Sequence, residues 1–232
     1  MRCSQDQYHG VMNARAHLIP ALLMIFISAS RGLAASEPFE KEIESFEAAD
    51  KAQPPPKDAV LFIGSSTFRY WKSLPEDFPG ITVINRGFGG SQIADCTRYA
   101  DRIAIPYHPR HVVIYAGDND IAAGKTPQQV LEEFQEFVNK IRSTLPDVPI
   151  SYVSIKPSIA RWKLIDRIKQ ANAMIEEYTC GEKNVDFINT FPLLLGSDGK
   201  PRPELFRPDG LHVNSKGYAL WIPVLTARLK DR

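Results

Sequence analysis

The sequence has almost no net charge. Its 28 Lys and Arg residues nearly balance its 27 Asp and Glu residues, which leaves a formal net charge of +1. Proteins that bind nucleic acid or anionic lipid through bulk electrostatics carry a marked positive excess, so neither partner is indicated. The chain also lacks internal repeats and low-complexity tracts, which excludes solenoid and disordered proteins. Its 232 residues are enough for one domain with a sizeable core and few for two.

Long hydrophobic runs are missing as well. The main apolar run, residues 18–29, is shorter than the about 20 residues that a membrane-spanning helix needs. Arg15 precedes it and small residues follow it, which is the layout of a secretory signal peptide cleaved after Ala34. We therefore expect residues 1–34 to be a signal peptide and the protein to be exported, periplasmic or secreted, with no stable membrane insertion. An uncleaved anchor is the alternative, and Met12 is an alternative start.

The region after the leader begins with a helical pattern. Apolar residues recur at helical spacing across residues 39–51, and three consecutive prolines at 54–56 end the pattern. We expect residues 35–57 to form an N-terminal helix and a proline-rich linker, and residues 58–232 to form the main domain.

Strand and helix patterns alternate through the main domain. Repeated strand and helix units build a parallel sheet with helices on both faces, which predicts an α/β three-layer sandwich. A five-stranded, flavodoxin-like parallel sheet is the natural topology. The expected strands are 59–63, 81–85, 111–115, 150–155 and 185–188, and the expected helices are 67–74, 91–103, 127–145, 160–177 and 215–230.

Cysteine is scarce, with three residues in the chain. Cys3 lies in the expected leader. Cys96 falls early in the helix after the second strand, and Cys180 falls at the far end of the helix after the fourth strand. Bridged cysteines need Cα atoms about 4.4 to 6.8 Å apart, so we predict no disulfide bond between Cys96 and Cys180.

Three polar motifs follow the first three expected strands, where the carboxyl ends of parallel strands assemble sites. Ser66 ends Gly64-Ser65-Ser66 and can act as a nucleophile or simply cap a helix. Gly90 ends a glycine-rich turn that can present bare N–H groups to an anion or be a plain turn, and no phosphate-binding spacing accompanies it.

The third motif and a late loop complete the set. Asn119 can donate its side-chain N–H to a developing oxyanion, although the acidic residues beside it also suit Ca²⁺, without the spacing of a calcium loop. Asp209 precedes His212 by three residues. At that spacing a carboxylate can accept a hydrogen bond from Nδ1 and leave Nε2 free to take a serine proton.

Together these blocks resemble the SGNH hydrolases, also called GDSL esterases or lipases, over residues 59–230. The resemblance places the family nucleophile on Ser66, its glycine on Gly90, its asparagine on Asn119 and its Asp-x-x-His pair on Asp209 and His212.

Two departures from the family pattern are plain. Ser65 stands where the family motif has Asp, and Val213 stands where many relatives have Pro. Neither position belongs to the triad, so the resemblance still implies catalysis.

The resemblance implies a serine esterase that works through an acyl-enzyme and needs neither metal nor cofactor. Ser66, Asp209 and His212 would be the triad, and the N–H of Ser66, the N–H of Gly90 and the amide of Asn119 would bind the oxyanion.

Short connections after the first strands favour a small acyl group, with acetylated carbohydrate as a candidate substrate. Trp71, Arg161 and Trp162 are expected to wall the substrate cleft, with core packing as the alternative. The other candidate functions are a lysophospholipase or thioesterase and a non-catalytic module that binds glycan or lipid. The expected partner is therefore a small-molecule or carbohydrate ester.

Overall fold

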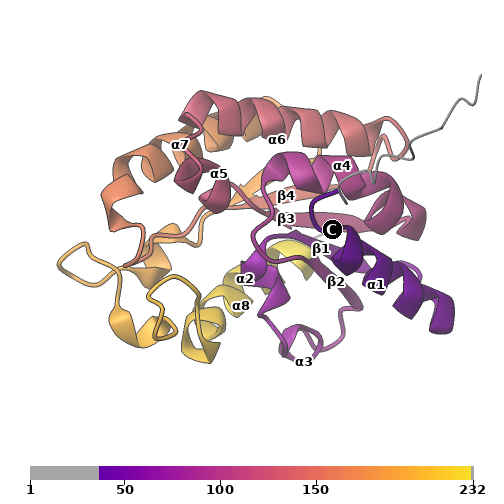
Figure 1. The fold of residues 1–232 in the computed structure, drawn as a ribbon, viewed down its shortest axis with the longest axis horizontal. Helices are drawn as coiled ribbons and strands as arrows, with labels where there is room; N and C mark the ends of the chain where they lie inside the picture. Colours follow the sequence, from indigo (N-terminus) through magenta and orange to yellow (C-terminus); the bar gives the residue numbers. More distant parts are fainter. Residues whose placement is uncertain (1–36, 231–232) are drawn as a thin grey trace, which may run out of the picture. The chain divides into compact units, whose positions relative to one another are not determined.

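The fold is organised around a five-stranded, all-parallel sheet with strand order β2-β1-β3-β4-β5, which confirms the predicted flavodoxin-like topology. This computed structural model describes residues 37–230, so the predictions about the leader lie outside the described residues. The strands are β1 (Val60–Gly64), β2 (Val83–Gly87), β3 (His111–Tyr115), β4 (Ile150–Val153) and β5 (Val185–Ile188) (Figure 1).

Alternate residues of the central strands face two separate cores. Leu61 and Ile63 of β1 pack with the helices of one face, whereas Val60 and Phe62 pack with those of the other. Both faces are apolar because helices cover both, as expected for a buried parallel strand. The result is the predicted three-layer sandwich.

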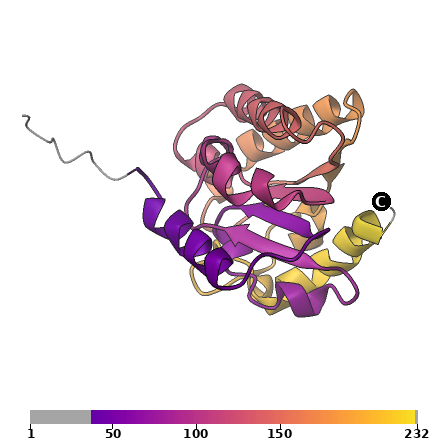
Figure 2. The same ribbon diagram turned by 90° about the vertical axis from the view of Figure 1, so that its right-hand side faces the viewer.

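The helices divide between the two faces of the sheet (Figure 2). One face carries α1 (Glu40–Ala52), α4 (Ile93–Ile103), α6 (Pro127–Arg142) and α7 (Ile165–Cys180). The other carries α2 (Ser66–Arg69), α3 (Leu74–Asp77) and α8 (Ser215–Lys230). The remaining described helical elements are α5 (Asp118–Ala122) and the 3₁₀ turns η1 (Ile105–Tyr107), η2 (Trp162–Leu164), η3 (Phe191–Leu194) and η4 (Pro203–Leu205).

The expected helix 67–74 is wrong, because two short helices, α2 and α3, take its place. Helix α2 ends at Arg69, and α3 begins at Leu74 with Pro75 in its first turn, where a helix needs no backbone N–H from the proline. Smaller differences occur at element ends. Helix α6 stops three residues earlier than expected, and η2 precedes α7 where one continuous helix was predicted.

Helix α1 is fixed to the domain by ion pairs. Arg102 of α4 binds Glu40 at 2.7 Å and Glu47 at 2.7 Å, and Arg69 of α2 binds Glu42 at 2.6 Å. The N-terminal helix therefore reaches both α4 and the helix that follows β1.

Cys96 is buried and Cys180 is exposed, and both are free thiols, as predicted. Among residues 37–230 no helix has the length and hydrophobicity needed to cross a membrane.

Candidate active site

Ser66 lies at the carboxyl end of β1, where the chain turns directly into α2. Gly64 makes this turn with φ 142°, and a Cβ there would lie 1.9 Å from the carbonyl oxygen of Tyr115. Only glycine fits so close to the neighbouring strand. The N–H of Ser65 then donates to Tyr115 O at 2.9 Å, and Ser66 begins the helix.

Ser66, His212 and Asp209 form one hydrogen-bonded chain. His212 Nε2 lies 2.9 Å from Ser66 Oγ, and His212 Nδ1 lies 2.7 Å from Asp209 Oδ2. Because a carboxylate only accepts, Nδ1 carries the proton and Nε2 is left to accept from the serine hydroxyl. The predicted contact between Asp209 and His212 is thus present, and Ser66 joins it from the far end of the sequence.

The carboxylate of Asp209 is held by its own loop as well as by the imidazole. Its Oδ1 accepts the backbone N–H of Leu211 at 2.8 Å and of His212 at 2.9 Å. Partial burial acts to raise the pKa of Asp209, but these hydrogen bonds and the imidazole lower it to about 2. The group is therefore ionised at neutral pH and fixes the orientation of the imidazole.

The Tyr70 side chain packs against the imidazole, and the Arg207 side chain packs against Tyr70 in turn. The Tyr70 ring meets the His212 ring edge-to-face with 4.8 Å between centroids, and the guanidinium of Arg207 lies 4.3 Å from the Tyr70 centroid. The backbone N–H of Arg207 also donates to His212 O at 2.7 Å. Sequence reasoning missed Tyr70, since it has no local motif.

The glycine turn after β2 is bound to the turn after β1. The N–H of Phe88 donates to Gly64 O at 2.8 Å. Gly90 has φ 86°, the left-handed conformation that favours glycine. The Phe39 ring packs on Phe88 with 5.3 Å between centroids, and a Cβ added at Gly90 would lie 3.9 Å from it. The N-terminal segment therefore packs against this turn.

Asn119 lies in α5, directly after β3, with both ends of its amide engaged. Its Nδ2 donates to Ser91 O at 3.0 Å, and its Oδ1 accepts from Arg161 Nη2 at 2.9 Å. The first contact joins α5 to the residue after Gly90, so the two predicted oxyanion elements are neighbours.

The carboxylate of Asp120 connects the turn after β2 to the turn after β3. It accepts the N–H of Gly117 at 3.0 Å, the N–H of Ile93 at 3.1 Å and Lys125 Nζ at 3.3 Å. The side chain is fully buried. It therefore joins the start of α5 to the start of α4.

A charged cluster of Asp118, Lys156 and Arg161 lies beside Asn119, and in it Asp118 and Lys156 are buried whereas Arg161 is partly exposed. Lys156 Nζ binds Asp118 Oδ2 at 2.5 Å, and Arg161 Nη1 binds Asp118 Oδ1 at 2.6 Å. Burial acts to raise the pKa of Asp118, but the two cations lower it below its usual value. Burial likewise acts to lower the pKa of Lys156, whereas Asp118 raises it.

These ion pairs bear on the calcium alternative. Cations or backbone N–H groups already bind the carboxylates of Asp118 and Asp120. Within residues 37–230, no group of three or more His, Cys, Asp or Glu is arranged to hold a metal ion.

The residues expected to wall the substrate cleft differ in placement. Trp71 is only 1% exposed, donates from Nε1 to Asp77 at 2.6 Å and stacks on Tyr218. It belongs to the core, which corrects the expectation that it contacts substrate. Arg161 is held by the charged cluster, and Trp162 is half-buried in η2.

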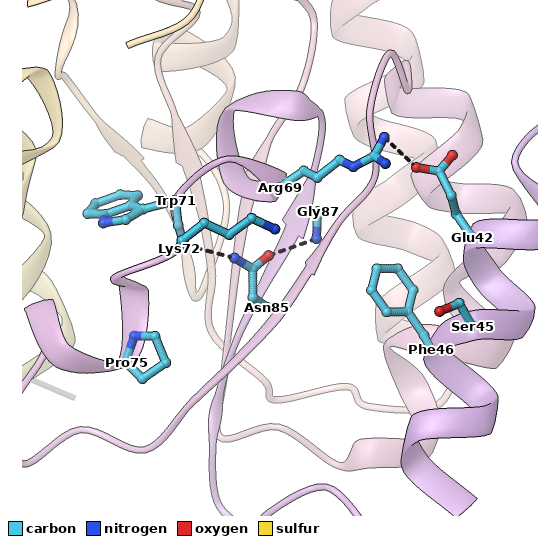
Figure 3. A pocket seen from close by; sticks show the side chains of 9 residues that line it. All are labelled: Glu42, Ser45, Phe46, Arg69, Trp71, Lys72, Pro75, Asn85 and Gly87. Carbon is cyan, nitrogen blue, oxygen red and sulfur yellow. Dashed lines mark hydrogen bonds and ion pairs between the residues drawn. The ribbon is translucent and has the colours of Figure 1, made fainter. Parts of the chain in front are cut away.

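A hollow of about 390 Å³ lies beside β2, between α1 and the helices after β1 (Figure 3). Asn85 spans it, donating to Phe68 O at 2.8 Å and accepting the N–H of Gly87 at 2.9 Å. Neither Ser66 nor His212 lines this hollow. Its contacts hold α2 against β2 and so support the nucleophile from outside the site.

Comparisons with known proteins identify the family and the fold. The family model of GDSL-like lipases and acylhydrolases matches residues 61–220. No curated protein sequence matches the chain.

Solved structures with a similar fold include a lipase and two esterases. A GDSL-like lipase from Bacteroides thetaiotaomicron aligns with a TM-score of 0.71 and 20% identity, over 82% of this chain and 97% of its own. A carbohydrate esterase of family 3 from Talaromyces cellulolyticus aligns at 0.60 and 18% identity, over 75% and 99%. An acetyl esterase with a bound acetate ion aligns at 0.58 and 17% identity, over 75% and 96%. At these identities the likeness concerns the fold.

Proposed function

Because this chain belongs to the GDSL-like lipase/acylhydrolase family and is a serine hydrolase of ester bonds, we propose that Ser66, His212 and Asp209 cleave esters of short acyl groups. The observation that carries the proposal is the continuous hydrogen-bonded chain from Asp209 through His212 to Ser66. A protein that only binds an ester has no need of a base aligned on a serine hydroxyl.

In this mechanism the oxygen of Ser66 forms a bond to the ester carbonyl carbon while His212 Nε2 takes the hydroxyl proton. The tetrahedral intermediate collapses by breaking the bond to the alcohol oxygen, and the alcohol leaves with the proton from His212. Water then attacks the acyl carbon and loses a proton to His212. The bond from the acyl carbon to Ser66 Oγ breaks, His212 returns the proton to Ser66, and the acid is released. Asp209 stays ionised throughout and stabilises the imidazolium.

The negative charge that develops on the carbonyl oxygen needs prearranged donors. The N–H groups of Ser66 and Gly90 and the amide of Asn119 are the donors in our proposal. Ser66 is the first residue of α2, and the first N–H groups of a helix have no partner within it. The contact from Asn119 to Ser91 O brings the other two elements together.

The short acyl group is inferred from the connections at this edge of the sheet. Ser66 enters α2 directly, and only a few residues separate β2 from α4 and β3 from α5. These connections hold too little chain to build a deep acyl tunnel or a lid. The fold neighbours named as an acetyl esterase and a carbohydrate esterase support acetylated carbohydrate as the substrate class.

The test is a kinetic series of p-nitrophenyl esters with wild-type protein, Ser66→Ala and Ser65→Ala. We expect wild-type kcat/KM to be highest for acyl groups of about two to four carbons, since the connections after β1, β2 and β3 are too short to build a long acyl channel. Ser66→Ala should remove activity, whereas Ser65→Ala should retain at least about a tenth of it, because Ser65 is outside the hydrogen-bonded chain.

Other results point to the alternatives. A maximum at about ten carbons or more would favour a lysophospholipase or thioesterase. Acetylated sugar bound without turnover would indicate a binding module, and activity lost in Ser65→Ala but kept in Ser66→Ala would overturn the assignment of the nucleophile.

A further inference from the structure

Arg161 bridges the charged cluster and the oxyanion side of the site. Its Nη1 binds Asp118 at 2.6 Å, and its Nη2 donates to Asn119 Oδ1 at 2.9 Å. We propose that Arg161 is a positioning residue that fixes the Asn119 amide so that one N–H faces the oxyanion. This inference rests on the proposed esterase function, because it assigns a role within that same site.

The donors and acceptors of Asn119 can be counted. A side-chain amide has one carbonyl oxygen and two N–H donors. Arg161 engages the oxygen, and Ser91 O accepts one N–H at 3.0 Å. One N–H remains. If the amide turned over, its NH₂ group would face the guanidinium, donor against donor, so Arg161 decides which end of the amide faces the site.

The guanidinium of Arg161 can fix the amide of Asn119 because Asp118 fixes the position of the guanidinium. Asp118 is 4% exposed, and Lys156 on its other oxygen is 1% exposed. Lys156 Nζ also lies 3.1 Å from the hydroxyl of Tyr115. A planar guanidinium offers several donors in fixed directions, so one arginine can bind a carboxylate and an amide together.

This role differs from substrate binding, which is the other function an arginine beside an ester site can have. An arginine that grips the substrate lowers KM and acts independently of Asn119. An arginine that orients Asn119 acts on kcat and only while the amide is present.

The test is a double-mutant cycle on p-nitrophenyl acetate. Asn119→Ala should lower kcat by about 10²- to 10³-fold, the usual effect of losing one oxyanion donor. Arg161→Gln should lower kcat at least about tenfold with KM within about twofold of wild type. In the Asn119→Ala background, Arg161→Gln should lower kcat by less than about threefold, since no amide is left to orient.

Two variants serve as controls. Arg161→Lys keeps the positive charge but not the two-pronged contact, so its kcat should fall between those of wild type and Arg161→Gln. Arg98→Gln removes an exposed arginine that pairs with Glu37 at 2.6 Å, and it should leave kcat unchanged. Melting temperatures of all variants separate loss of activity from loss of fold.

An increase in KM without a change in kcat, or effects that multiply in the cycle, would overturn the positioning role. Failure of the esterase function is recognised separately, because wild-type protein would then hydrolyse no ester of the series. In that case the ¹⁵N side-chain amide signal of Asn119 still decides. It should shift or broaden in Arg161→Gln and stay in place in Arg98→Gln, and an unchanged signal in Arg161→Gln would contradict the proposal.

Discussion

Asp209 and Asp118 of the active site both bind positively charged or protonatable partners, but in opposite surroundings. Asp209 binds His212 at 2.7 Å with 46% of its side chain exposed, whereas Asp118 binds Lys156 at 2.5 Å with 4% exposed. An exposed pair gains little because water screens it, and a buried pair stabilises the fold only while both partners remain. The two carboxylates therefore have different roles although their contact distances are similar. Asp209 takes part in catalysis. Asp118 stabilises the fold, and it supports catalysis through its contact with Arg161.

Asp209→Asn should produce the largest effect, and the effect should be on activity. Asparagine keeps the size of the side chain, but its NH₂ group can favour the wrong imidazole tautomer, so kcat should fall by about 10⁴-fold. Because the carboxylate is half exposed, the melting temperature should change little. Steady-state kinetics and thermal melts on the same preparation check both parts. A kcat within about tenfold of wild type would remove Asp209 from the triad.

Asp118→Asn is the matched substitution in the charged cluster, and its main effect should be on stability. It leaves Lys156 buried without a carboxylate, so the free energy of unfolding should fall by about 3 to 5 kcal/mol, measured by urea titration. Adding Lys156→Met should recover part of that loss, because the unpaired buried charge is then gone. A urea midpoint equal to that of wild type would show that the two carboxylates are not different after all.

The exposed pair, Asp209 and His212, could be predicted from the sequence. Asp209 and His212 are three residues apart, so one loop is enough to bring them together. Ser66 follows an apolar strand, and the alternation of strands and helices predicts that it lies at the edge where sites assemble. The same alternation predicted the five strands and their order.

The cluster of Asp118, Lys156 and Arg161 could not be predicted, because its contacts join distant parts of the chain. Lys156 and Arg161 follow β4, about 40 residues after Asp118, and a lysine after a strand gives no sign that it will be buried. Arg161 was expected to wall the cleft, yet it binds Asp118 and Asn119. Trp71 is in the core because α8 packs over it, and the sequence around Trp71 contains no information about that contact.

The smallest predicted effect concerns the pH dependence of stability. The pKa of Asp209 is lowered from its ordinary value of 3.8 to about 2 in the folded protein. A lowered pKa means that the unfolded chain binds the proton more readily. The stabilisation is therefore fully present above about pH 4 and is lost as the pH falls towards 2. Because the side chain is exposed, it should amount to less than about 1 kcal/mol.

Thermal melts of wild type and Asp209→Asn between pH 7 and pH 2.5 measure this contribution. The small stability advantage of wild type should stay constant down to about pH 4 and shrink below it. Asp118 is present in both proteins, so its own acid titration cancels in the difference. If the stability difference between the two proteins grew as the pH fell, Asp209 would not be the acceptor of the imidazole N–H. The contrast between an exposed catalytic carboxylate and a buried structural one would then no longer hold for Asp209.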